Sequence, residues 1–153
     1  IANSFLNNTA PTNSVITLSN TAEVNANNQD IICYAWTSVA GYSSFGSYTG
    51  NGSADGPFVF TGFRPRWLLI KRTDSTAPWH LYDTARGSHN VVVTTLAANL
   101  SSAESAFTSG YDIDLLSNGF KARAATSIAI NTSNGTYIYI AFAEHPFKTA
   151  RAR

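Results

Sequence analysis

The chain has 153 residues, of which 44% are hydrophobic and 12% are charged, and its formal net charge is +1. This length and hydrophobic fraction suit one domain with a core of its own. The near-zero charge argues against a nucleic-acid binder, which must neutralise many phosphates. No apolar run approaches the roughly 18 residues of a membrane span, so we expect no membrane insertion. Cys33 is the single cysteine and there are three histidines, so we expect no intrachain disulfide, no metal and no cofactor.

The N-terminal part is expected to change from a polar lead-in to strands. Asn, Pro and Thr over residues 1–14 argue against regular structure, and we place a single domain over residues 15–153. Alternating apolar residues predict a short strand over residues 15–18 and a clear strand over residues 30–39. Cys33 has apolar neighbours in this second strand, so we expect a small buried hydrophobe rather than a nucleophile.

Residues 45–72 form the most distinctive stretch. Aromatic residues such as Phe58 and Phe60 at alternate positions favour a half-buried strand. Three glycines and a proline within residues 50–57 predict a reversal of the chain. We therefore expect two antiparallel strands joined by a loop that faces water and is free to meet a neighbour. The apolar second strand, around residues 67–70, would fill the core.

Further strands are predicted along the C-terminal half. They cover residues 79–83, 91–96, 113–116, 120–123 and 136–143. Asn118-Gly119 between the third and the fourth is a strong hairpin signal. The last strand is apolar at successive positions, which favours burial on both faces in the middle of a sheet. Residues 97–110 give no clear pattern.

The two ends of the chain contain related segments. Residues 24–36 and 130–142 align with a constant offset of 106, and each has an apolar residue, an Asn-rich turn and then an aromatic and aliphatic run. Because each is also preceded by a weaker strand, we infer two related hairpins near the two ends. Few helix formers and many turn formers complete the pattern. The predicted fold is all-β, an antiparallel β-sandwich, with a jelly roll as one form that fits.

One polar and aromatic group offers a candidate ligand-binding site, namely Trp79, His80, Tyr82, Asp83 and Arg86. An aromatic ring can stack on the apolar face of a sugar while Asp and Arg side chains bind its hydroxyls. Strand alternation places Trp79 and Asp83 on one face and His80 and Tyr82 on the other. A second interpretation stays open, in which Trp79 belongs to the core and Asp83 pairs with Arg86 to fix a corner.

The residue types of catalytic sites occur, but not in diagnostic patterns. His80, Asp83 and Ser88 have the composition of a nucleophilic triad, yet no Gly-x-Ser-x-Gly turn accompanies them. Asp112 and Asp114 would share one face of a strand as a carboxylate pair, although solvated edge charges explain them more simply. We therefore expect a protein that is not an enzyme and has no catalytic residues.

Several short motifs carry a family resemblance. They are Gly41-Tyr42-Ser43, Phe45-Gly46-Ser47-Tyr48-Thr49-Gly50-Asn51-Gly52, Gly62-Phe63-Arg64-Pro65, Lys71-Arg72-Thr73-Asp74, Leu116-Ser117-Asn118-Gly119-Phe120-Lys121 and Tyr137-Ile138-Tyr139-Ile140-Ala141-Phe142-Ala143-Glu144. With them the chain, over residues 30–153, resembles an uncharacterised C-terminal domain of tail-fibre-like and other virion structural proteins of tailed bacteriophages.

The resemblance implies a location more than a mechanism. It suggests a non-enzymatic structural protein on the virion exterior, either at a tail-fibre tip or as a capsid decoration subunit. Its partners would be other virion proteins and further copies of the chain, with a trimer favoured, and no nucleic acid. The alternative is a carbohydrate-binding module that recognises a glycan receptor on the host surface, with Trp79 and His80 at its site. The family establishes no binding residue that could be carried over.

Overall fold

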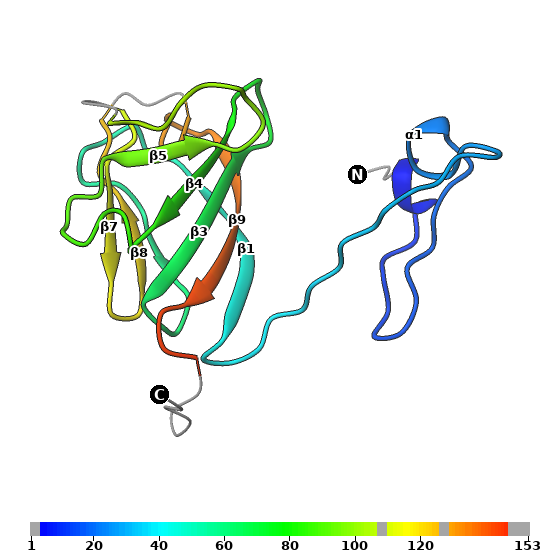
Figure 1. The fold of residues 1–153 in the computed structure, drawn as a ribbon, viewed down its shortest axis with the longest axis horizontal. Helices are drawn as coiled ribbons and strands as arrows, with labels where there is room; N and C mark the ends of the chain where they lie inside the picture. The colour runs from blue at the N-terminus through cyan, green and yellow to red at the C-terminus, as the bar shows by residue number, and fades with distance from the viewer. Residues whose placement is uncertain (1–3, 107–109, 126–128, 147–153) are drawn as a thin grey trace. The chain divides into compact units, whose positions relative to one another are not determined.

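The computed structural model describes residues 4–106, 110–125 and 129–146, so the expected end of the family resemblance, residues 147–153, lies outside the described residues (Figure 1). The chain divides into two compact units, residues 1–36 and 37–153. The first unit contains a 3-10 turn, η1 (Ser4–Leu6), and one short helix, α1 (Ala22–Asn25). The division at residue 36 differs from the domain start that we expected at residue 15.

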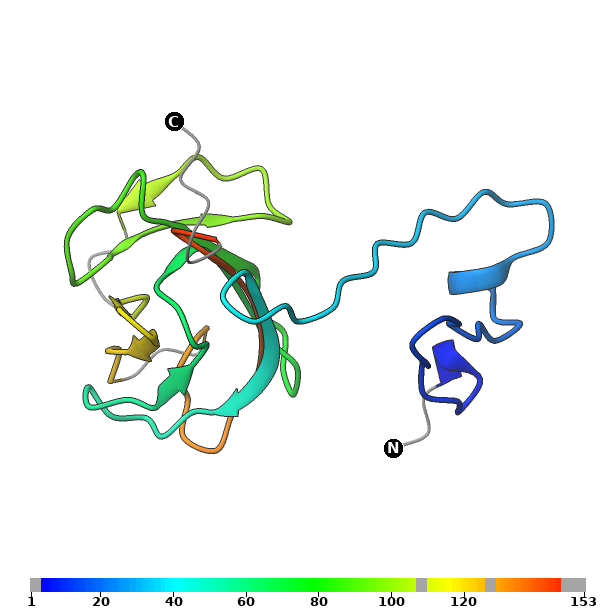
Figure 2. The ribbon, with the colours of Figure 1, turned by 90° about the horizontal axis from the view of Figure 1, so that it is seen from below.

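The second unit is a sandwich of two antiparallel sheets. Its described strands are β1 (Ser43–Thr49), β2 (Phe58–Phe60), β3 (Pro65–Arg72), β4 (Trp79–Asp83), β5 (Thr94–Ala97), β6 (Ser105–Ala106), β7 (Ile113–Leu116), β8 (Gly119–Ala122) and β9 (Thr136–Ala143). The larger sheet has the order β1-β9-β3-β4-β5-β6 and the smaller one the order β2-β8-β7. Figure 2 shows the curved larger sheet facing the short strands of the smaller one. The all-β sandwich predicted from the sequence is confirmed.

The path of the chain has one feature of a jelly roll. β1 pairs with β9 in the larger sheet, and β2 pairs with β8 in the smaller sheet, so the first two and the last two strands run together as a ribbon. The inner strands depart from that pattern, because β3, β4 and β5 follow one another as a meander. The jelly-roll wrapping is therefore limited to the outer strands.

The core between the sheets is rich in tyrosine. Tyr48 stacks on Tyr137 with 4.9 Å between ring centroids, and Phe120 of the smaller sheet meets the Tyr48 ring edge-on at 5.8 Å. The polar ends of such rings need partners. The Tyr48 hydroxyl donates to the Ile130 carbonyl at 2.8 Å, and the Tyr82 hydroxyl donates to the Tyr111 carbonyl at 2.9 Å. These bonds let the sandwich bury large rings without orphaned hydroxyls.

The stretch over residues 45–72 does not form the expected hairpin. β1 and β2 belong to different sheets, and the loop over residues 50–57 carries the chain from one sheet to the other. β3 then returns to the larger sheet between β9 and β4, where Leu68 and Ile70 are fully buried. The prediction that residues 67–70 fill the core is confirmed for Leu68 and Ile70, whereas Trp67 and Leu69 lie on the opposite face of β3. The predicted strand pairing was wrong because it was taken from neighbours in the sequence.

The loop over residues 50–57 is held in place, contrary to our expectation of a free loop. Asn131 is fully buried, and its side-chain oxygen accepts the Asn51 amide hydrogen at 2.9 Å. Its side-chain nitrogen donates to the carbonyls of Ser53 at 2.8 Å and of Ala124 at 2.9 Å. Lys121 of β8 also forms an ion pair with Asp55. The glycines of this loop therefore allow the chain to pass close to neighbouring backbone as it crosses from one sheet to the other.

The hairpin predicted around Asn118-Gly119 is confirmed, but its glycine has another role. Leu116 pairs with Gly119, so the two turn residues are Ser117 and Asn118, and Gly119 already belongs to β8. A Cβ atom at Gly119 would lie 2.1 Å from the carbonyl oxygen of Val59. The glycine is required by the close approach of β2 rather than by the turn.

The strands predicted near the N-terminus were wrong. Residues 15–18 and residues 30–38 have no strand, so only the C-terminal member of the two related segments ends in one. Cys33 is exposed rather than buried. β9 does lie in the middle of a sheet, yet its burial alternates, with Tyr137 and Tyr139 buried and Ile138 exposed. A strand needs a partner, which residue preferences alone do not supply.

Candidate functional site

The five candidate ligand-binding residues do not converge. His80 and Tyr82 of β4 point into the core, with exposed fractions of 1% and 0%, while Trp79 and Asp83 are half-buried on the opposite face. Trp79 and Asp83 are four residues apart on one strand, or about 13 Å. Leu81 lies between them on the same face, so they do not form one compact group. The predicted placement of Trp79 and Asp83 on one face of β4, and of His80 and Tyr82 on the other, is confirmed. The candidate residues therefore do not form one site.

Asp83 belongs to a network of ion pairs at the end of β4. Its carboxylate lies 3.6 Å from Arg66 and 4.0 Å from Arg86, and Arg86 also meets Glu104 at 3.1 Å. The carboxylate further accepts the Ala85 amide hydrogen at 2.8 Å. The second interpretation of the sequence, an Asp83–Arg86 pair at a corner, is therefore confirmed for this part, whereas its placement of Trp79 in the core was wrong.

His80 is a buried imidazole inside the sandwich. Neither of its ring nitrogens has a hydrogen-bond partner, and the ring lies 4.8 Å from the Tyr111 ring. Burial, with a smaller contribution from the Lys71 charge, lowers the pKa of His80 to about 4. The residue is therefore neutral at physiological pH. Because it points away from Trp79, it cannot form a surface site with that residue.

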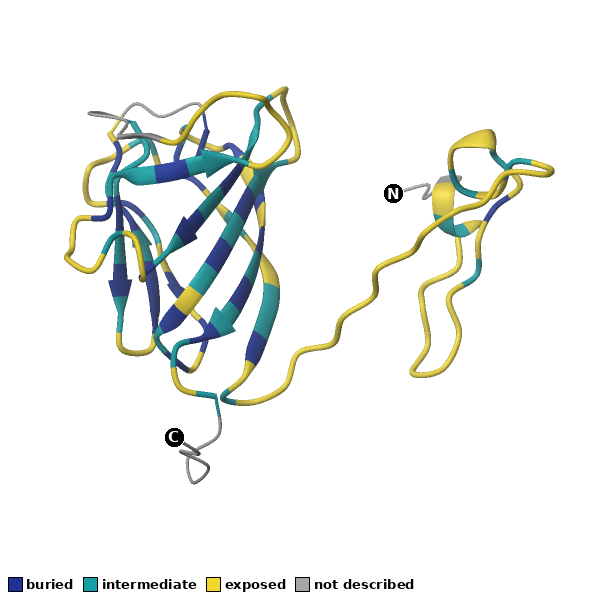
Figure 3. Cartoon of the chain, viewed as in Figure 1, coloured by how far each residue is buried: buried dark blue, intermediate teal, exposed yellow. Residues whose placement is uncertain are grey.

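The outer face of the larger sheet is apolar. Register places one side chain from each of five neighbouring strands in a single row across this face, in the order Phe45, Ile140, Leu69, Leu81 and Leu96. Flanking positions add further apolar side chains, which are Trp67, Trp79, Ile138 and Phe142. These nine residues are called the outer apolar face below. Most of them are half-buried and none is fully covered (Figure 3).

An aromatic cluster marks one end of the outer apolar face. Phe142 lies at its centre, with ring centroids 5.7 Å from Trp67, 6.0 Å from Phe45 and 5.9 Å from Tyr42. The solvent side of an antiparallel sandwich normally alternates to polar residues. The sequence carried this signal as unbroken apolar runs in β3 and β9, which we had interpreted as filling of the core in β3 and as burial on both faces in β9.

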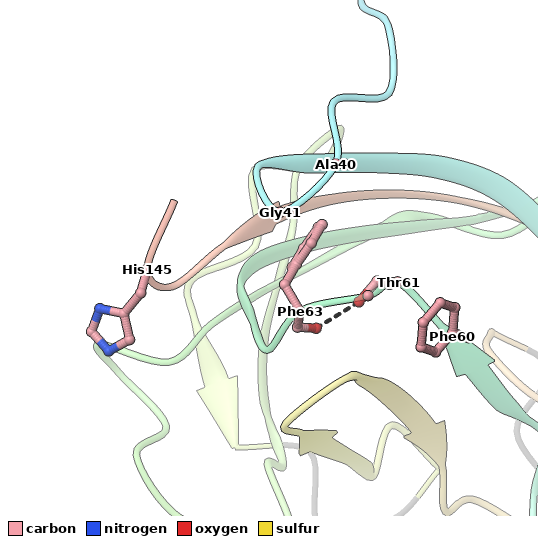
Figure 4. A pocket seen from close by; sticks show the side chains of 7 residues that line it. Ala40, Gly41, Phe60, Thr61, Phe63 and His145 are labelled. Atoms are coloured by element: carbon pink, nitrogen blue, oxygen red, sulfur yellow. Dashed lines mark hydrogen bonds between the residues drawn. The ribbon is translucent and has the colours of Figure 1, made fainter. Parts of the chain in front are cut away.

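A pocket of about 500 Å³ lies beside the turn that precedes β1 and the turn that precedes β3. Its lining is mainly apolar and is formed by Ala40, Gly41, Phe60, Thr61, Gly62, Phe63 and His145. Figure 4 shows how the labelled residues lie around it. The Thr61 hydroxyl already donates to the Phe63 carbonyl at 2.6 Å. A specific ligand site needs several convergent polar groups. This pocket offers one imidazole at its edge, and we do not treat it as the functional site.

The remaining catalytic candidates are also dispersed. His80 and Asp83 lie on opposite faces of β4, and the Ser88 hydroxyl lies 2.9 Å from His89 instead. Asp114 forms an ion pair with Arg123 at 3.4 Å. Among the described residues there is no cluster of metal-ligating side chains. Likewise, no helix in the described parts of the chain has the length and apolar character to cross a membrane.

Comparison with known proteins identifies one family. A family described as "Domain of unknown function (DUF7483)" matches residues 1–146 of the chain. No curated protein and no solved structure matches. The matched residues include the first compact unit, 1–36, and the sandwich up to residue 146.

Proposed function

The chain belongs to the DUF7483 family, a domain of unknown function, and we propose that it is a non-enzymatic structural protein of a tailed-bacteriophage virion. In this proposal it lies on the exterior of the particle, at a tail-fibre tip or as a capsid decoration subunit. Its partners are other virion proteins and further copies of the chain, with a trimer favoured. The resemblance of its sequence motifs to phage virion proteins supports this role.

The outer apolar face is the structural observation that carries the proposal. Contiguous apolar surface on the outside of a domain is typical of a surface that contacts another protein. Leu69, Leu81 and Ile140 form the middle of that surface, and β-sheet hydrogen bonds on both sides fix their backbones. A rigid apolar surface of this kind suits a lasting contact with a neighbouring virion protein.

The location is tested on intact particles. We expect antibodies against the chain, coupled to gold, to label the capsid or the tail tip of virions that encode it. Mass spectrometry of the same purified particles should detect the protein. Absence of the chain from washed particles would contradict the proposal.

The role of the outer apolar face is tested with matched variants. Leu81→Glu places a charge in the middle of the face, and Ser75→Glu adds the same charge to an exposed loop. We expect both variants to fold, as judged by circular dichroism, and only Leu81→Glu to be lost from assembled particles. Equal incorporation of the two variants would exclude this face as the contact.

A carbohydrate-binding module is the second candidate, and the exposed side of Trp79 favours it. The indole lies on the outer apolar face beside Lys71 of the neighbouring strand, which is a geometry that can stack on a sugar. If this function holds, Trp79→Ala abolishes the signal on a glycan array while Phe58→Ala, on the other sheet, retains it. A wild-type protein that binds no glycan on the array excludes this candidate.

A further inference from the structure

Residues 30–38, called the arm below, have the sequence of a strand but no strand structure. Large side chains alternate along it, so that Ile32, Tyr34 and Trp36 would share one face of an extended chain. Ile32 is 78% exposed and Tyr34 is 73% exposed. Side chains of this size and shape favour a pleated surface with neighbours on both sides. The arm is therefore a strand-forming segment that lacks a sheet.

The turn before the arm repeats the turn before β9. Asn28 has a φ of 57° and Asn134 has a φ of 59°, at the offset of 106 that relates the two segments. The Gln29 amide donates to the Ala26 carbonyl at 3.3 Å, and the Gly135 amide donates to the Thr132 carbonyl at the equivalent positions at 2.9 Å. The same local structure thus leads into a strand in one case and into the arm in the other. β9 differs in having β1 and β3 as partners.

β1 offers the kind of edge that such a segment requires. It stands at the end of the larger sheet, with β9 as its neighbour among the described strands, and its seven residues contain no charge and no proline. Natural edge strands are usually shortened, charged or covered, because an open edge pairs with other strands. The opposite edge of the same sheet, β6, has two described residues, Ser105–Ala106. β1 is thus an uncharged seven-residue edge strand, beyond which no further described strand pairs.

The chain does not continue its own hairpin along that edge. Val39 and Ser43 exchange backbone hydrogen bonds of 2.9 and 3.1 Å, which is the first step of an antiparallel pairing. The next step would bring the Phe45 amide to the Thr37 carbonyl. Instead the Ser38 hydroxyl accepts the Phe45 amide at 3.3 Å, and the Ser43 hydroxyl donates to the Thr37 carbonyl at 3.0 Å. Side chains therefore end the pairing at Ser38.

We propose that the arm of one copy adds as a strand to the β1 edge of a second copy of this chain. Each copy gives one arm and receives one, which closes as a two-fold pair or as a three-fold ring. Backbone hydrogen bonds supply the contact, as in other cases of strand addition. This inference rests on the self-association within the proposed function, and it names the contact that holds the copies together.

A proline in the arm tests the pairing. Ile32→Pro removes a backbone donor and fixes φ, which blocks strand addition, while Ile32→Val keeps the strand preference. We expect light scattering to show an oligomer for the wild type and for Ile32→Val, and a single chain for Ile32→Pro. The melting temperature of the sandwich at matched chain concentration shows whether Ile32→Pro still folds. An oligomeric Ile32→Pro variant overturns the arm contact and leaves self-association standing, whereas a monomeric wild type overturns both.

Cross-linking between differently marked chains tests the location of the arm. One chain keeps Cys33 in the arm, and the other carries Cys33→Ser with Thr49→Cys on β1, so that each chain has one thiol. The control partner carries Cys33→Ser with Ser117→Cys on the exposed turn of the other sheet. With a bismaleimide reagent, mixed products should form with Thr49→Cys and at least tenfold less with Ser117→Cys. Equal yields from the two partners, or none from Thr49→Cys, overturn the proposal.

Discussion

The buried imidazole of His80 should make the sandwich lose stability in mild acid. The pKa of His80 is lowered to about 4 in the folded chain, while an unfolded chain has the ordinary value of about 6.5. The unfolded state therefore takes up the proton first as the pH falls. The contribution of His80 to stability is complete above the unfolded pKa and is lost as the pH falls from there toward the folded pKa.

The magnitude follows from the two pKa values. Between about pH 7.5 and about pH 5.5 the free energy of unfolding should fall by about 1.4 kcal/mol on account of this one residue. Almost all of that loss comes from protonation of the unfolded chain, so it depends little on how far below 5 the folded pKa lies. The calculation requires only that His80 stays neutral inside the fold, which its lack of hydrogen-bond partners favours.

The assay is urea unfolding at the two pH values with linear extrapolation. His80→Leu replaces the ring by an apolar side chain of similar size and should remove this part of the pH dependence. It should also keep or raise the stability near neutrality, because two buried nitrogens without partners disappear. His145→Gln removes an exposed imidazole and serves as the matched control. If wild type and His80→Leu lose the same stability between the two pH values, the reasoning is wrong.

Three further predictions concern packing and backbone conformation, each measured as the free energy of unfolding. Asn131→Leu should cost about 3 kcal/mol, because it leaves the Asn51 amide and two carbonyls without partners; a loss under about 1 kcal/mol would contradict the anchoring of the loop. Gly119→Ala should cost about 3 kcal/mol, since its Cβ would meet the carbonyl oxygen of Val59, and an unchanged stability would refute that close approach. Asn134→Ala should cost about 1 kcal/mol for its positive φ, whereas Asn28→Ala, which lies outside the sandwich, should leave the sandwich transition unchanged.

Local pattern was enough to predict some strands and not others. β4, β7, β8 and β9 were found from alternation and from the turn at Asn118, because each of these signals is contained within a few residues. The pairings of β1 with β9 and of β2 with β8 join the two ends of the sandwich, and no nearby residue encodes them. The arm was mistaken for a strand because its residue preferences are those of one, while no described strand of the same copy pairs with it.

The candidate site shows the same division. The alternation along β4 correctly separated Trp79 from His80, because it depends only on the period of a strand. The alternation could not show which face of β4 points into the core, because that inference requires one face to be apolar and the other polar. Here both faces of the larger sheet carry apolar residues, as Leu69 and Leu68 illustrate. The outer apolar face was therefore missed because its residues are apolar like those of the core. The same apolar character makes this face a candidate contact surface.

The pairing of β1 with β9 determines how the sandwich would respond to tension applied through the segments that flank it in the chain. Ser43 at the start of β1 lies opposite Phe142 near the end of β9, so both connections leave from the same end of the larger sheet (Figure 1). Tension applied through the two connections would separate this pair of strands one hydrogen bond at a time rather than shear them all together. At the opposite end of this sheet, the loop over residues 50–57, the turn over residues 73–78 and the turn over residues 131–135 lie together. Substitutions at exposed positions of this end, such as Ser75, would change its surface while leaving intact the buried hydrogen bonds of Asn131 that hold the loop over residues 50–57.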